Sequence, residues 1–127
     1  IVGDDGANQL NGGGGDDQLL GGKGDDAYYL DRLGDQVFEA ADEGRDSVFT
    51  FVSVDFSGQA VEDLILLGAA NLNATGNDLA NVLTGNAGLN LLRGRGGDDT
   101  YVIQNTGDRI VEGVDQGVDT VVSTVSF

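Results

Sequence analysis

The chain has 127 residues, with 22 acidic and 6 basic side chains, so its formal net charge is −16 at pH 7. Self-repulsion of this size opposes compaction unless cations relieve it. The acidic balance excludes a nucleic-acid-binding protein, because phosphate contacts need clustered Lys and Arg. Histidine and cysteine are absent, which excludes thiol nucleophiles, disulfides and ordinary zinc sites. Apolar runs are too short for a transmembrane segment.

Glycine and aspartate dominate the polar part of the composition. There are 22 Gly and no Pro, and 18 of the acids are Asp against 4 Glu. Glycine supplies backbone positions with φ > 0, and aspartate favours turns and hard-cation sites. Hydrophobic residues make up 39% of the chain, which argues against a disordered linker.

Three nine-residue units lie end to end at the start of the chain: GDDGANQLN, GGGGDDQLL and GGKGDDAYY, beginning at Gly3, Gly12 and Gly21. Their shared pattern is GGxGxDxUx, with Asp or Asn sixth and a large apolar residue eighth. Each unit therefore predicts a six-residue turn followed by a three-residue strand that buries one side chain.

The next part of the chain keeps this period loosely. Asp35 follows Asp26 by nine residues, and Asp46 comes eleven later, which indicates an insertion of two near residues 42–45 and a loss of one elsewhere. We expect one longer strand inside the stack at residues 47–56, rather than an exposed adhesive edge, and a strand rather than a helix at 61–67. Residues 49–70 lack the turn motif, so whether they continue the repeating structure and its cation sites stays open.

The units return as GNDLANVLT, GNAGLNLLR and GRGGDDTYV from Gly76, Gly85 and Gly94, an offset of 73 residues. The long repeat therefore spans residues 3–75 and 76–127, with the second copy incomplete. It aligns Glu39 with Glu112 and Asp46 with Asp119. We interpret residues 1–127 as a single module and, because it begins in mid-pattern, as a fragment of a larger protein.

A unit that buries one side chain has to stack on its neighbours. Two units form an 18-residue coil, so about seven coils are expected, with parallel strands about 4.8 Å apart. The eighth residues then fill a narrow interior. We assign Tyr28 and Tyr101 to this interior rather than to a sugar-stacking pair, because both occupy the eighth position.

Stacking also places sixth-position side chains in columns beside turn carbonyls, where their repulsion calls for a cation. Ca²⁺ accepts six to eight oxygen ligands in loose geometry, so we expect about four to six ions. Facing pairs are Asn8 with Asp26, Asp17 with Asp35, Asp26 with Asp46, Asn81 with Asp99, Asn90 with Asp108, and Asp99 with Asp119; sites with Asn should be weaker. The turn glycines expected to line the ions are Gly12, Gly13, Gly15, Gly21, Gly22, Gly24, Gly94 and Gly97.

GGKGDDAYY and GGGGDDQLL resemble the nonapeptide of the RTX, or haemolysin-type calcium-binding, repeat family. The longer segments GDDTYVIQNTGDRIVEGVDQGVDTVVSTVSF and VEDLILLGAANLNATGNDLANVLTGNAG resemble the long repeats of large secreted RTX proteins. The resemblance implies an all-β, right-handed parallel β-roll that is unfolded at low cytoplasmic calcium. It also implies type I export by a Gram-negative bacterium and folding outside the cell or at its surface.

Two functions follow as hypotheses. The first is a calcium-binding module whose ion binding drives folding and stability outside the cell. The alternative is an adhesion or polysaccharide-recognition module that accompanies a catalytic domain of the parent protein. We do not expect an enzyme, because no acid–base pair or activated nucleophile is visible.

Overall fold

The computed structural model describes residues 1–112 and 117–124. Short strands alternate with turns throughout these residues, and none of the described residues is helical. Each nine-residue unit gives one strand, as its pattern predicts. The strands are β1 (Gln9–Asn11), β2 (Gln18–Leu20), β3 (Ala27–Leu30), β4 (Gln36–Phe38), β5 (Ser47–Thr50), β6 (Val54–Asp55), β7 (Asp63–Leu66), β8 (Asn73–Thr75), β9 (Val82–Thr84), β10 (Leu91–Arg93), β11 (Thr100–Ile103), β12 (Arg109–Ile110) and β13 (Thr120–Ser123).

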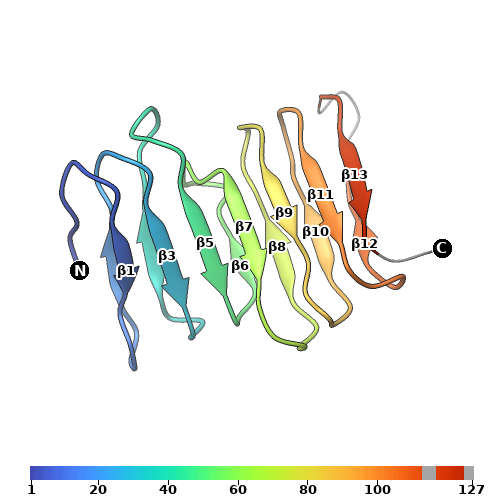
Figure 1. Ribbon diagram of the computed structural model, residues 1–127, viewed down its shortest axis with the longest axis horizontal. Helices are drawn as coiled ribbons and strands as arrows, with labels where there is room; N and C mark the ends of the chain where they lie inside the picture. Colours follow the sequence, from blue (N-terminus) through green and yellow to red (C-terminus); the bar gives the residue numbers. More distant parts are fainter. Residues whose placement is uncertain (113–116, 125–127) are drawn as a thin grey trace.

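The chain coils into a parallel β-solenoid, as predicted (Figure 1). The odd-numbered strands form one seven-stranded sheet in the order β1-β3-β5-β7-β9-β11-β13, and it runs through both copies of the long repeat. The even-numbered strands form the opposite layer in two parts, β2-β4 and β6-β8-β10-β12. The described residues make about six turns instead of the expected seven, because the seven strands of the odd-numbered sheet are separated by six coil steps.

Coil length varies in the middle of the chain. Along the odd sheet, Gln9 pairs with Ala27, Ala27 with Ser47, Ser47 with Asp63, Asp63 with Val82, Val82 with Thr100 and Thr100 with Thr120, which gives steps of 18, 20, 16, 19, 18 and 20 residues. The insertion of two residues lies where predicted, in the turn that contains Asp42, whose φ is 63°. The expected net loss of one residue is spread over two coils: the next coil is two residues shorter than 18, and the one after it is one residue longer.

Eighth-position residues form the centre of the interior, and Leu30, Leu66 and Ile103 at the ends of longer strands add to it. Leu10, Leu19, Leu83 and Leu92 are buried, and so are Tyr28 and Tyr101, which confirms the interior assignment of both tyrosines. Alternation along each strand sends the neighbouring residues outward, as in the exposed–buried–exposed pattern of β1 and β2. So narrow a core buries little apolar surface per residue, and the turns have to contribute to stability.

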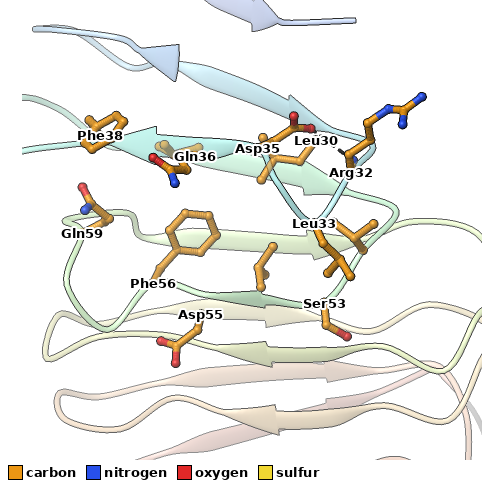
Figure 2. A pocket seen from close by; sticks show the side chains of 13 residues that line it. Leu30, Arg32, Leu33, Asp35, Gln36, Phe38, Ser53, Asp55, Phe56 and Gln59 are labelled. Carbon is orange, nitrogen blue, oxygen red and sulfur yellow. Dashed lines mark hydrogen bonds between the residues drawn. The ribbon is translucent and has the colours of Figure 1, made fainter. Parts of the chain in front are cut away.

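The even-numbered layer is interrupted between β4 and β6. Residues 47–56 do not form the one longer strand that we expected: Thr50 bonds the backbone of Val52 through its hydroxyl, and the chain bends between β5 and β6. The resulting coil has 16 residues. Its strand β6 pairs with β8 and does not pair with β4, so it forms the edge of its sheet. A surface cavity of about 400 Å³ lies at the break, with the ring of Phe56 pointing from the β6 side toward β4 (Figure 2). The expected strand at 61–67 is confirmed as β7.

Arg95 stands at a turn position where two other units have glycine. Gly13, Gly22 and Arg95 are each second in their unit and have φ of 82°, 97° and 78°. A side chain in this left-handed region costs about 1 kcal/mol or more relative to glycine. The turn accepts Arg95 because the stacking of the coils fixes the backbone on both sides.

We predict that Arg95→Gly raises the free energy of unfolding in saturating calcium by about 1 kcal/mol, because it relieves the left-handed arginine. Urea denaturation followed by circular dichroism measures this. Lys23→Gly is the matched control: it also removes a positive charge from a turn, but Lys23 has no positive φ. Equal effects of the two substitutions would attribute the gain to charge and contradict the backbone argument.

Candidate metal sites in the stacked turns

The six facing pairs predicted from the sequence all lie together in the structure. In each, the backbone N–H of the earlier residue donates to a side-chain oxygen of the later one. The N–O distances are 2.7 Å for Asn8–Asp26, 2.8 Å for Asp26–Asp46, 2.8 Å for Asn81–Asp99, 2.8 Å for Asp99–Asp119, 3.1 Å for Asp17–Asp35 and 2.9 Å for Asn90–Asp108. The columns are therefore real, and each coil is tied to the next by its sixth residue.

The turn glycines make room for these side chains. A Cβ on Gly12, Gly21 or Gly94 would overlap the carboxylate of Asp17, Asp26 or Asp99, because the sixth side chain folds back over the first glycine of its unit. The other five predicted glycines have positive φ: Gly13, Gly15, Gly22, Gly24 and Gly97. Glycine is thus required by close approach at the first position and by backbone conformation at the others.

Several carboxylates in the columns are buried with one oxygen unpaired. Within the described part of the chain, Oδ2 of Asp17, Asp26, Asp46 and Asp99 has no hydrogen-bond partner. Asp46 and Asp99 are completely buried, and Asp26 is 2% exposed. Leaving such oxygens unpaired is costly in a protein interior, and a hard cation between neighbouring turns would satisfy them. These residues fit Ca²⁺ by their donor chemistry and by their unmet bonding.

Two predicted ligands are already engaged by their own turns. Asp35 accepts from the backbone N–H groups of Asp31 and Arg32 with one oxygen and from Asp17 with the other, at 3.1 Å in each case. Asp108 repeats this arrangement with the N–H groups of residues 90, 104 and 105. Both carboxylates therefore brace turns, and less of their bonding capacity is left for an ion.

In turns with Asn at the sixth position, the side-chain amide of the Asn forms hydrogen bonds with nearby polar groups of the turns. The Asn81 side chain donates to the carbonyls of Val61 and Glu62 at 2.9 and 3.2 Å, and accepts from the N–H of Asn77 at 3.0 Å. Asn90 behaves alike, donating to Leu72 O at 3.2 Å. Asn8 exchanges bonds with Asp4. An amide nitrogen thus supplies turn oxygens with the positive partner that a cation would supply elsewhere.

Two glutamates that the sequence pattern did not nominate join the aspartates. Asp26, Glu39 and Asp46 each offer a carboxylate oxygen, and these atoms lie within 4.8 Å of one another, with all three residues buried. Asp99, Glu112 and Asp119 form the corresponding cluster in the second copy, where Asp99 is buried, Asp119 is half-buried and Glu112 is exposed. The nonapeptide has no glutamate position, so motif matching misses them. The alignment of Glu39 with Glu112 beside the two-residue insertion was the available clue.

The electrostatics of these clusters are those of crowded acids. Burial raises the pKa of Glu39 to about 8, with further increases from the charges of Asp46 and Asp26. Burial likewise raises the pKa of Glu112 to about 7 and that of Asp99 to about 6. Each cluster therefore opposes full ionisation near neutral pH, which is the condition that a bound divalent cation reverses.

Residues 49–70 continue the solenoid without the turn motif. Glu62 takes the column position, accepting from the N–H of Asp46 at 2.7 Å. Next to it, Asp63 forms an ion pair with Arg45 at 2.6 Å. In the described residues, the two three-acid clusters lie outside this segment. The solenoid thus continues through this segment, where the Arg45 side chain supplies a positive charge beside the acidic residues.

The model of the RTX calcium-binding nonapeptide repeat matches the chain in four copies, over residues 1–37 and 75–102, which is about half of its length. No curated protein and no solved structure matches the chain. The described residues include no helix of the length and apolarity needed to cross a bilayer. The matched ranges contain the Asp17, Asp26 and Asp99 turns but not Glu39 or Glu112.

We predict that Asn81→Ala lowers the free energy of unfolding in saturating calcium by about 2–4 kcal/mol, because it leaves buried carbonyl and N–H groups unpaired. Urea denaturation measures the loss, and calorimetry of calcium binding should give an unchanged number of ions. Asn8→Ala, in a half-buried turn, is the control and should cost less. A variant that folds with one ion fewer would assign Asn81 as a ligand instead.

We predict that the calcium-free protein becomes more stable as the pH falls. The folded-state pKa of Glu39, about 8, lies above its ordinary 4.5, so its stabilising contribution is complete below 4.5 and is lost as pH rises through 8. Glu112 and Asp99 act in the same direction, with losses near pH 7 and 6. Circular dichroism in metal-free buffer between pH 8 and 4.5 tests this, because protonation of these acids should increase the folded, β-structured fraction. A β signal that falls as the pH is lowered over this range would contradict the raised pKa values.

Proposed function

Because the chain belongs to the RTX calcium-binding repeat family and is thereby a calcium-binding module of a secreted protein, we propose that ion binding in its turns drives its folding outside the cell. In this proposal, low calcium leaves the segment unfolded during export. High extracellular calcium then favours the coiled state by mass action.

One observation supports the proposal above the others: the folded chain buries carboxylate oxygens that it does not pair. Counting only described residues, five such oxygens belong to Asp17, Asp26, Glu39, Asp46 and Asp99. A chain of net charge −16 with so narrow a core has little else to offset their repulsion. Cations that bind only the folded turns supply the missing free energy.

The proposed load remains about four to six ions, and it is unevenly distributed. Turns that contain unpaired carboxylate oxygens, at Asp17, Asp26, Asp46 and Asp99, are the first candidates. The asparagine turns are the last, because their amides already bond the neighbouring oxygens. Ligand charge tunes calcium affinity, so the acid-rich turns should fill at the lowest concentrations.

We propose further that the segment is non-catalytic and that a Gram-negative parent exports it through type I secretion, the route typical of its family. Polysaccharide or cell-surface recognition stays the alternative. The surface that would favour it is the outer face of the odd sheet, where the rings of Tyr29 and Phe49 stack 5.2 Å apart beside the exposed Phe51. Aromatic faces of this kind suit sugar rings, and ion binding would hold them in place.

We predict that a calcium titration monitored by circular dichroism shows a cooperative gain of β structure, reversed by chelator. Asp46→Asn should raise the calcium midpoint about tenfold or more, because it removes one charged ligand. Asp5→Asn, the same substitution at an exposed turn position, should leave the midpoint unchanged. β structure that persists unaltered in chelator would sink the proposed function.

A further inference from the structure

Three features occur together at two places in the chain and nowhere else in the described residues. A buried tyrosine replaces the aliphatic eighth residue, at Tyr28 and Tyr101. Each of these strands is followed by a 20-residue step to the next strand of the odd sheet. The longer turn region of each step contains a glutamate, Glu39 or Glu112. A recurring combination of core residue, insertion and acid points to a common purpose.

The contacts of Tyr28 show what the combination builds. Its hydroxyl accepts a hydrogen bond from the N–H of Gly21 at 2.7 Å and donates to Oε1 of Glu39. The backbone N–H of Glu39 donates to the Gln59 side chain at 2.8 Å, which fixes the other end of the residue. A glutamate side chain has three rotatable bonds, and these contacts hold it in one orientation.

The held glutamate presents an unpaired oxygen to two further acids. Oε2 of Glu39 and Oδ2 of Asp26 and Asp46 are the buried atoms without partners in this part of the described structure, and the residues are 8%, 2% and 0% exposed. The other oxygens of the two aspartates accept backbone N–H groups at 2.7 and 2.8 Å. Each of the three carboxylates thus has one anchored and one unanchored oxygen, and the three residues bring carboxylate oxygens within 4.8 Å of one another.

We propose that Glu39, oriented by Tyr28, is a direct ligand of a calcium ion shared with Asp26 and Asp46, and that Glu112 completes the matching site with Asp99 and Asp119. This inference rests on the proposed function, that the turns bind calcium, and adds a ligand that lies outside the nonapeptide. In the second copy, the N–H of Gly94 donates to the hydroxyl of Tyr101 at 2.8 Å, as Gly21 does to Tyr28.

Three carboxylates distinguish these sites from the other turns. The Asp17–Asp35 turn has two acids in its column, and Asp35 is bonded by its own turn. A third formal negative charge strengthens the attraction for a divalent ion, provided that the ion neutralises the repulsion among the acids. The Glu39 and Glu112 sites should therefore be the tightest in the chain and should order their turns before the others fill.

Calcium binding by Glu39→Gln, Glu112→Gln and the double variant, measured by calorimetric titration of the calcium-free chain with folding followed in parallel by circular dichroism, tests the proposal. Each single change should weaken one tight site about tenfold to a hundredfold, and the double variant should weaken both. Glu43→Gln is the matched control, because Glu43 lies in the same turn outside the three-acid cluster. Unchanged tight binding in a double variant that still folds with calcium would overturn the proposal while leaving the proposed function intact.

A second readout reports where the ions lie relative to the tyrosine rings. The chain has three Tyr and no Trp, so luminescence of bound Tb³⁺ excited through tyrosine reports ions close to those rings. Tyr28→Phe with Tyr101→Phe should remove most of the emission, and Tyr29→Phe should retain it because that ring stacks on Phe49 outside the core. Emission that follows Tyr29 would overturn the proposal. Failure of the wild-type chain to gain β structure with calcium would instead contradict the proposed function.

Discussion

Repulsion among buried carboxylates is the constraint on which this molecule is organised. Asp26, Asp46 and Asp99 are almost or fully buried, and each keeps one oxygen unpaired within the described residues. Their other oxygens hold the backbone of the preceding coil, so the same side chains both join the coils and burden them with charge. A solenoid with a one-residue-deep core has no large apolar surface to offset this burden. Its stability is thereby tied to its ionic surroundings.

The asparagine turns show the alternative solution to the same packing problem. Asn81 and Asn90 occupy the column positions of aspartates, yet their amide groups bond the neighbouring oxygens directly. The backbone path is retained and the charge is removed. Arg45 provides a third solution in the segment that lacks the motif, by pairing with Asp63. The chain thus alternates regions that need an external cation with regions that carry their own donors.

Much of this arrangement was accessible from the sequence, because it follows from period. The nine-residue spacing predicted the strands, the interior ladder and all six facing pairs, since stacking places identical positions over one another. The metal role of those residues stays a prediction. Glu39 was missed because it belongs to an inserted turn that has no counterpart in the nonapeptide. The bend between β5 and β6 was missed because it depends on a bond between the Thr50 hydroxyl and the backbone of Val52, which apolar patterning does not encode.

The divided even-numbered layer has a mechanical consequence. On one face, seven strands are hydrogen-bonded without interruption (Figure 1), while on the other the ladder stops between β4 and β6. A rod built this way resists flexing unequally: across the gap no strand pair is broken and isolated bonds such as that from the Glu39 N–H to the Gln59 side chain are strained, whereas stretching the intact sheet breaks the hydrogen bonds between its strands. Tension along the axis of the solenoid would therefore deform the gap between β4 and β6 first. An array that repeats the 73-residue unit would have one such compliant point per unit, spaced evenly along an otherwise stiff fibre.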